Sequence, residues 1–146
     1  MSKENIAQQL KGKFQERIIK YEEKSERRVY IDIEPAMIPE IAEYTFRDLG
    51  CRMVTATGID TPQGIEILYH FSHDASGQVI SLRTLLRDKK NPQIASLALI
   101  IKGADWIERE IWELLGVNFT GHPNLTHLLL IDDWPEGKHP LRKEKG

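Results

Sequence analysis

The sequence lacks several features that would assign a function directly. Its 146 residues contain one cysteine, Cys51, so an internal disulfide is excluded and no set of thiolates is available to hold an iron–sulfur cluster. The ten glycines are scattered and form neither GxGxxG nor GxxxxGK, so no recognisable phosphate-binding loop is present. We therefore do not predict that this chain carries electrons or binds a nucleotide cofactor.

Long apolar runs are also lacking. The longest, residues 94–101, has eight residues including a serine, whereas a helix needs roughly 20 apolar residues to cross a bilayer. The first ten residues lack the apolar core of a signal peptide. The sequence therefore predicts a soluble cytoplasmic protein, or one that is attached to a membrane only through partners.

The charge balance excludes a further class of function. The formal net charge is -2, with 29% charged and 40% hydrophobic residues, which indicates neither disorder nor a polyanion-binding surface. Nucleic acid is therefore not an expected partner. A single domain of this length buries roughly two thirds of its unfolded surface, which is enough for a core of its own.

Hydrophobic periodicity changes along the chain between helix and strand patterns. Apolar residues at spacings of three or four predict one amphipathic helix over residues 2–26. Alternation over residues 29–33 predicts a half-buried strand. A second helix is predicted over residues 35–48, where prolines can open it, and a third over residues 93–102.

Three strand-like segments occupy the middle of the chain, at residues 51–59, 65–73 and 78–86. The spacers between them are short, which is typical of an antiparallel meander. We predict an α+β fold, with a mainly antiparallel sheet of about four strands, helices packed on one face and an extended C-terminal tail. The other face of the sheet would be wet or covered by a partner. The middle strand would have Ile65, Ile67, Tyr69 and Phe71 on one face.

One stretch near the C-terminal end reads as a short helix. Asp105, Arg109 and Glu113 follow at four-residue steps, so acid, base and acid are neighbours on one face. Asp105 with Glu108 resembles a capping arrangement at a helix start, and Gly116 is suited to end the helix. The residues expected to be buried on another face are Ile107, Ile111, Leu114 and Leu115.

The residues after this helix favour turns and extended structure, because proline fixes φ and stops helices. We therefore predict an α+β body over residues 1–120 that includes the helix, and an extended partner-binding tail over residues 121–146, within one domain overall. The turn-forming elements of the tail are Gly121-His122-Pro123, Trp134-Pro135, Gly137 and His139-Pro140.

The order of several short elements in the last part of the chain is characteristic. They are Glu108-Arg109-Glu110, Leu114-Leu115-Gly116, Phe119, Gly121-His122-Pro123, Leu125, Asp133-Trp134 and Pro140-Leu141-Arg142-Lys143. This order resembles the 30 kDa subunit family of respiratory complex I, which also supplies a subunit of membrane-bound energy-converting hydrogenases. The family usually has a basic pair where this chain has Thr126 and His127.

The resemblance implies a non-catalytic scaffold subunit in the cytoplasm-facing, peripheral arm of an NADH:quinone oxidoreductase or a membrane-bound hydrogenase. Its partners would be the large catalytic subunit and the small iron–sulfur subunit. Iron–sulfur clusters and a NiFe centre or FMN would lie in those partners, and no cofactor or metal in this chain.

The residues expected at the partner interface lie in the predicted helix and tail. Trp112 is the best candidate for an anchor, because it falls off the apolar stripe of the helix. The full set is Glu108, Arg109, Glu110, Trp112, Glu113, Gly121, His122, Pro123, Asp133, Trp134, Pro140, Leu141 and Arg142.

Two other functions are compatible with the residues. One is an independent metal-dependent enzyme, although the spacing of its possible ligands matches no short-range metal pattern. The other is a free-standing protein-binding module. The carboxylates of the Glu108-Arg109-Glu110 run are not expected to form a catalytic pair, because successive helix positions point about 100° apart. The ligands of the metal alternative would be His122, His127, His139 and Asp133.

Overall fold

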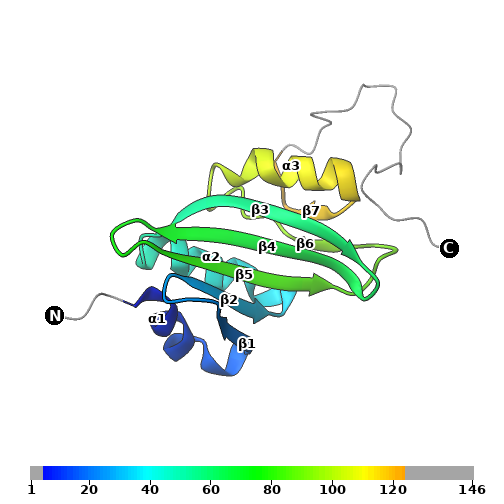
Figure 1. Ribbon diagram of the computed structural model, residues 1–146. Helices are drawn as coiled ribbons and strands as arrows, with labels where there is room; N and C mark the ends of the chain where they lie inside the picture. Colours follow the sequence, from blue (N-terminus) through cyan, green and yellow to red (C-terminus); the bar gives the residue numbers. More distant parts are fainter. Residues whose placement is uncertain (1–4, 124–146) are drawn as a thin grey trace.

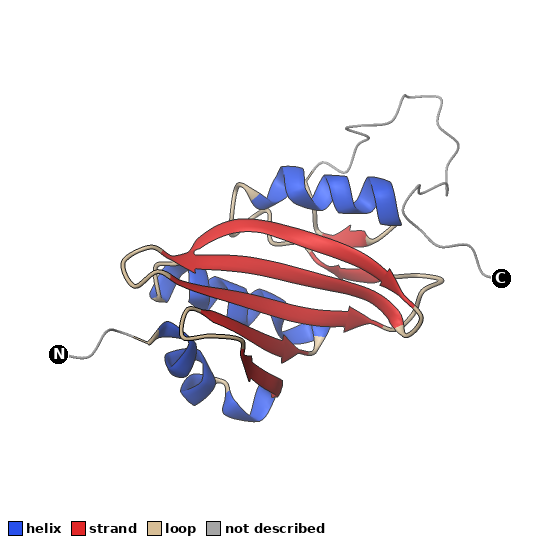
Figure 2. Ribbon diagram, in the orientation of Figure 1, coloured by secondary structure: helices blue, strands red, loops and turns tan. Residues whose placement is uncertain are grey.

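The structure is a computed structural model that describes residues 5–123. A curved sheet forms the centre of the described chain, and helices lie above, behind and below it in the view of Figures 1 and 2. The elements are, in order, α1 (Ile6–Lys13), the 3-10 turn η1 (Gln15–Arg17), β1 (Ile18–Glu23), β2 (Arg28–Ile33), the 3-10 turn η2 (Pro35–Met37), α2 (Ile38–Glu43), the π turn η3 (Tyr44–Asp48), β3 (Arg52–Thr61), β4 (Gly64–His73), β5 (Gln78–Leu86), β6 (Gln93–Ala95), α3 (Ala104–Leu115) and β7 (Asn118–Thr120).

The main sheet has the strand order β1-β2-β5-β4-β3. Strands β3, β4 and β5 form the antiparallel meander that the short spacers predict, and β1 pairs with β2 in an antiparallel hairpin. Strand β2 joins this meander by pairing with β5 in parallel. The α+β class and the mainly antiparallel sheet are confirmed, with five strands in the main sheet where about four were expected.

The core lies between one face of the sheet and the helices. The four residues of β4 that were predicted to share a face, Ile65, Ile67, Tyr69 and Phe71, are all 0% exposed. Their register partners Leu82 and Ile80 on β5 lie on the same face and are also buried. Alternation along β4 thus places a continuous apolar surface beneath the helices, as expected for a half-buried sheet.

The predicted helix over residues 2–26 is wrong in its second half. Helix α1 ends at Lys13, and residues Ile18–Glu23 form the edge strand β1. The apolar residues of α1 are buried, whereas Ile18 and Tyr21, which continue the same spacing, are only partly buried. β-branched and aromatic residues such as these favour strands, and pairing with β2 outweighs the helical periodicity.

The predicted helix over residues 93–102 is also wrong. Residues Gln93–Ala95 form β6, which pairs in parallel with β7, and turns follow before α3. Ile94 and Phe119, which are register partners in this pair, are 4% and 1% exposed. A short apolar run does not distinguish a buried strand from a helix, and the deciding partner comes from beyond α3.

Candidate functional site at helix α3 and the start of the tail

Helix α3 has the predicted end but not the predicted start. At its end, Gly116 adopts φ +79° and donates its N–H to the carbonyl of Trp112 at 2.8 Å. Glycine suits this position because a side chain is strained in the left-handed region. At its start, Gly103 is the cap residue and no side chain caps the helix. The capping role predicted for Asp105 with Glu108 is therefore wrong.

A glycine on β3 determines how closely α3 approaches the sheet. A Cβ atom built at Gly58 would lie 2.5 Å from Leu115 Cδ1 and 3.2 Å from Ile111 Cγ2. Gly58 pairs with Ile67, so it belongs to the core face of the sheet. The helix therefore packs directly against the strand backbone at this point, and its buried side reaches the interior of the fold.

The charged residues of α3 differ widely in exposure. Glu108 and Glu113 are both 0% exposed and the Arg109 side chain is 13% exposed, whereas Glu110 is exposed to solvent. The fold therefore buries charged residues of α3 as well as its apolar ones. Two of the predicted interface residues, Glu108 and Glu113, are thus covered by the chain itself.

The apolar residues of α3 follow the prediction in part. Ile111 and Leu115 are buried as expected, while Ile107 and Leu114 are half-buried. The helix therefore presents its second half most closely to the sheet, where Gly58 leaves room for it.

Glu108 is hydrogen-bonded to the segment that precedes α3. Its Oε1 lies 2.5 Å from Ser96 Oγ and its Oε2 accepts from the Leu97 N–H at 2.8 Å. Burial raises the pKa of the Glu108 carboxyl group, and these two hydrogen bonds oppose that shift. Tyr69 on β4 is also buried, and burial together with Glu108 raises the pKa of its hydroxyl group. The charge of Glu108 therefore acts on the Tyr69 hydroxyl group inside the core.

His122 completes a buried cluster with these groups. Its side chain is 0% exposed, and its Nε2–H donates to the carbonyl oxygen of Asp105 at 3.1 Å. The same nitrogen lies 3.5 Å from Asp105 Oδ1 and 3.9 Å from Glu108 Oε1. We call Ser96, Asp105, Glu108 and His122 the carboxylate–histidine cluster. It joins the turn before α3, α3 itself and the start of the predicted tail.

Backbone hydrogen bonds hold the start of the tail in the same place. The His122 N–H donates to the Phe119 carbonyl at 3.2 Å, and the Ser96 N–H donates to the Thr120 carbonyl at 2.8 Å. Gly121 lies between Thr120 and His122 with φ +79°. Residues 120–122 are thus fixed beside the first half of α3, where the Asp105 carbonyl is.

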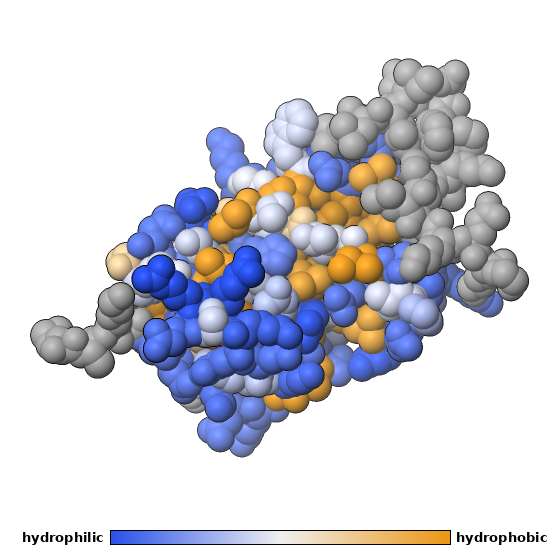
Figure 3. All heavy atoms as spheres, viewed as in Figure 1, coloured by the Kyte–Doolittle hydropathy of each residue, from blue (hydrophilic) through white to orange (hydrophobic). Residues whose placement is uncertain are grey.

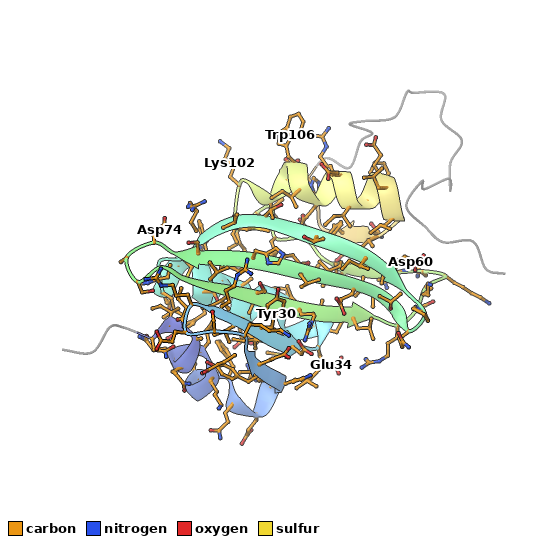
Figure 4. The ribbon with its side chains drawn as sticks, in the orientation of Figure 1. Tyr30, Glu34, Asp60, Asp74, Lys102 and Trp106 are labelled. Atoms are coloured by element: carbon orange, nitrogen blue, oxygen red, sulfur yellow. The ribbon has the colours of Figure 1, made fainter. Side chains whose placement is uncertain are left out.

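The outer surface of α3 exposes a tryptophan. Trp106 is 66% exposed, and Figure 4 shows it, like Lys102, pointing away from the sheet. The Arg109 guanidinium lies 5.4 Å from the centre of the Trp106 ring, a cation–π arrangement. Trp112, the predicted anchor, is half-buried and packs against the core. Trp112 was predicted to be the anchor because it falls off the apolar stripe, but Trp106 falls off it too, and spacing alone does not show which of the two the fold covers.

The remaining predicted interface residues divide into two groups. Gly121 and Pro123 are exposed, so their backbone is accessible at the start of the tail. The rest, Asp133, Trp134, Pro140, Leu141 and Arg142, lie outside the described residues, as do His127 and His139 of the metal alternative. Within residues 5–123 no group of three or more His, Cys, Asp or Glu side chains could hold a metal ion. The interface assignments stay predictions.

The hydrophobic surface of the molecule is uneven in the view of Figure 3, where apolar atoms gather over part of the sheet and hydrophilic atoms lie over other parts of the same face. Leu99, in the turns that lead into α3, is the most exposed large hydrophobic side chain among the described residues, at 77%. No helix in the described part of the chain is long and apolar enough to cross a membrane.

Comparison with known proteins relates this site to one family. The profile of the family described as the respiratory-chain NADH dehydrogenase 30 kDa subunit matches residues 31–145. The match begins in β2 and includes the whole of α3 and the carboxylate–histidine cluster. The elements that carry the resemblance in the sequence are therefore part of the match.

Individual proteins of known sequence extend this likeness. The C subunit of the NADH-quinone oxidoreductase of Ruegeria sp. (strain TM1040) is 34% identical over 120 residues, which cover 78% of this chain and 58% of that protein. The C subunit of the F(420)H(2) dehydrogenase of Methanosarcina mazei is 33% identical over 147 residues, covering 99% of this chain and 92% of that protein. The chain therefore spans little more than half the length of the first of these relatives and nearly the full length of the second.

A solved structure has the same fold. It is a chain of the membrane-bound sulfane sulfur reductase, an archaeal respiratory membrane complex. The TM-score is 0.81 at 24% identity, and the match covers 94% of this chain and 81% of that chain.

Proposed function

Because the chain belongs to the family of the respiratory-chain NADH dehydrogenase 30 kDa subunit, we propose that it is a non-catalytic scaffold subunit of a membrane-bound, complex I-like oxidoreductase. The observation that carries the proposal is the similarity to the C subunit of the F(420)H(2) dehydrogenase, which extends over 99% of this chain. On this proposal the chain lies in the peripheral arm on the cytoplasmic side. Its partners are the large catalytic subunit and the small iron–sulfur subunit.

The names of the similar proteins differ in the electron donor or acceptor. They include NADH-quinone oxidoreductase and F(420)H(2) dehydrogenase among the relatives, and a sulfane sulfur reductase complex among the structures. A subunit shared by enzymes with different substrates is suited to a role in assembly rather than to substrate recognition. Iron–sulfur clusters and the NiFe or FMN centre then belong to the partner subunits, and this chain keeps those subunits in a fixed relation.

The outer surface of α3 and the start of the tail are the proposed docking region. Trp106 offers a large exposed ring, and tryptophan and arginine are enriched among the residues that dominate interface energies. Arg109 lies over that ring. The carboxylate–histidine cluster supports this surface from below, because Glu108 and His122 fix α3 and the start of the tail in one position. A rigid support reduces the ordering cost of binding.

Affinity purification from the native host tests the proposal. The chain would be tagged at its N-terminus, and the captured proteins would be identified by mass spectrometry and assayed for oxidation of NADH, F420H2 and H2. We expect the large catalytic subunit and the small iron–sulfur subunit in stoichiometric amounts. The identity of the accompanying subunits and the active electron donor then distinguish the types of complex. Recovery of the chain alone under gentle conditions would contradict the scaffold role.

A further inference from the structure

The two edges of the main sheet differ in how well they are protected against pairing with another chain. Strand β1, at one edge, has six residues and carries the charged residues Lys20, Glu22 and Glu23. Strand β3, at the other edge, has ten residues, and residues 53–59 within it include neither a charged residue nor a proline. Short length and charged side chains protect an edge from further pairing, whereas a long uncharged edge is open to it.

On its outer side, the backbone of β3 presents hydrogen-bonding groups that no other described strand uses. β3 pairs with β4 in one register from Thr55 to Thr61, and a two-residue loop joins Thr61 to Gly64. The pair beside such a loop is hydrogen-bonded, so alternation turns the N–H and C=O groups of Ala56 and Gly58 away from β4. The strand order places no further strand there within residues 5–123. The Ala56 carbonyl accepts a long local bond from the Thr55 hydroxyl, at 3.4 Å.

Helix α3 extends over this edge on the core side of the sheet. Its residues Ile111 and Leu115 pack against Gly58 on β3. Glu108 faces the interior, because its charge acts on the Tyr69 hydroxyl group of β4. The other side of the helix therefore points beyond β3, and Figure 1 shows α3 running along the upper edge of the sheet.

Two apolar residues of α3 occupy that outward side. At about 100° per residue, Ile107 lies about 100° around the helix axis from Glu108, and Leu114 lies about 120° from it. Both apolar side chains are only half-buried. Val54 and Ile59 on β3 are 47% and 44% exposed, and Figure 3 shows apolar atoms where α3 and β3 adjoin. We call residues 54–59 together with Ile107 and Leu114 the β3 edge surface.

We propose that the β3 edge surface binds an extended segment of a partner subunit, which adds to the main sheet as a further strand beside β3. Another extended backbone is the group that pairs with N–H and C=O groups spaced along a strand edge. Neighbouring strands lie about 4.8 Å apart, so the added strand lies beneath the outward side of α3. Apolar residues at alternate positions of the segment then cover Ile107 and Leu114. An uncharged segment matches the uncharged residues 53–59.

The position of the edge favours a partner subunit over the end of this chain. His122, near the end of the described residues, donates to the Asp105 carbonyl. Asp105 lies about 160° around α3 from Ile107, so the end of the described chain is on the other side of the helix. Trp106, in the proposed docking region, directly precedes Ile107, so a subunit docked on α3 reaches the β3 edge surface. The assignment to a partner subunit rests on the proposed function.

Amide hydrogen exchange tests strand addition directly. It would be measured by mass spectrometry on the full chain alone and in the complex purified from the native host. Peptides that span residues 53–60 should exchange at least about tenfold more slowly in the complex, because pairing protects the outward N–H groups of Ala56 and Gly58. Peptides from β1 should exchange at the same rate in both samples.

Two outcomes of this measurement would overturn the proposal. The first is unchanged exchange of residues 53–60 in a complex that contains the partner subunits, which would leave the scaffold role intact. The second is equally slow exchange in the isolated chain, which would show that this chain or a second copy of it already occupies the edge. Recovery of the chain without any partner subunit would contradict the scaffold role and strand addition together.

Two matched variants give an independent readout. Ile59→Lys places a charge on β3, and Ile19→Lys makes the same change on β1, where Ile19 is 58% exposed. In quantitative affinity purification we expect Ile59→Lys to lower the recovery of partner subunits at least about fivefold, and Ile19→Lys to leave it within about twofold of the wild type. Urea unfolding checks that both variants fold. Equal recovery with the two folded variants would overturn the proposal, and if Ile59→Lys does not fold, the exchange measurement on the wild type decides.

Discussion

Glu108 is the residue whose position departs most from its appearance in the sequence. In the run Glu108-Arg109-Glu110 the two carboxylates look equivalent, yet only Glu108 is 0% exposed. Helical geometry places the two on different sides of α3, and the side that Glu108 faces is covered by Ser96 and Leu97. The consequence is a buried acid whose charge state depends on pH.

Stability should depend on pH through Glu108. Because burial raises the pKa of this carboxyl group, the folded state binds its proton more strongly than the unfolded state. This contribution to stability is complete below the ordinary glutamate pKa and is lost as pH rises through the raised pKa. Glu108→Gln lacks this pH-dependent contribution. As pH rises between those two pKa values, the free energy of unfolding of the variant should therefore increase relative to that of the wild type, by about 1.4 kcal/mol per pH unit. Urea unfolding of both proteins between about pH 4 and about pH 9 measures the difference, and a constant difference would contradict the assignment.

The Tyr69 hydroxyl is a buried polar group with no hydrogen-bond partner among the described residues. Removing an unpaired buried polar group relieves its desolvation cost, which is about 1–3 kcal/mol. Tyr69→Phe should therefore leave the free energy of unfolding unchanged or raise it, while the ring keeps its packing. A loss of more than about 1 kcal/mol in urea unfolding would show that the hydroxyl is hydrogen-bonded in the folded protein.

At the scale of the elements, the contact between α3 and β3 depends on Gly58. A Cβ there meets the end of the Leu115 side chain, which can rotate, and approaches Ile111 Cγ2 at 3.2 Å. Gly58→Ala should therefore cost little, whereas the γ carbons of Gly58→Val should cost about 1–3 kcal/mol through overpacking. Gly12 on α1 is the matched control, because nothing lies within 4 Å of its Cβ position. Gly12→Ala should be neutral or stabilising by up to about 1 kcal/mol.

Thermal and urea unfolding of these three variants tests the predicted order of their stabilities. In Gly58→Val, the additional change Leu115→Ala should recover part of the loss, since the two sites are in contact and their effects are not additive. Equal stability of Gly58→Val and the wild type would mean that α3 is not held against β3 at this point.

The elements that could be predicted from the sequence are those determined by local pattern. The alternation in Ile65, Ile67 and Tyr69 identifies β4 and its buried face, and Gly116 identifies the end of α3. Strands β1 and β6 could not be predicted in this way, because each depends on a partner strand elsewhere in the chain. In both, the apolar spacing fits a helix as well as a strand, and pairing decides.

The candidate site shows the same limit. The sequence predicts α3, and the family motif includes His122, but nothing in the spacing indicates that His122 returns to the Asp105 carbonyl. That contact accompanies the parallel pair of β6 and β7, which brings Ser96 and Thr120 together. A cluster assembled from three segments cannot be inferred from any one of them.

At the scale of the whole molecule, α3 is the side proposed to face other subunits. Trp106 is 66% exposed there, while Trp112 on the same helix packs against the core. Trp106→Ala should therefore leave the free energy of unfolding within about 0.5 kcal/mol of the wild type and lower the recovery of partner subunits. Trp112→Ala should instead lower the free energy of unfolding, because Trp112 packs against the core. Urea unfolding and quantitative affinity purification of both variants make this comparison.

The most direct measurement is site-specific photo-crosslinking in the native host. A photoreactive amino acid would replace Trp106 on α3 or, as the control, Ile19 on the edge strand β1, which is 58% exposed. If the chain is a scaffold that docks through α3, the probe at position 106 should crosslink to the large catalytic or the small iron–sulfur subunit, and the probe at position 19 should do so much less. Crosslinks of equal yield at both positions, or none to another oxidoreductase subunit, would contradict docking through α3.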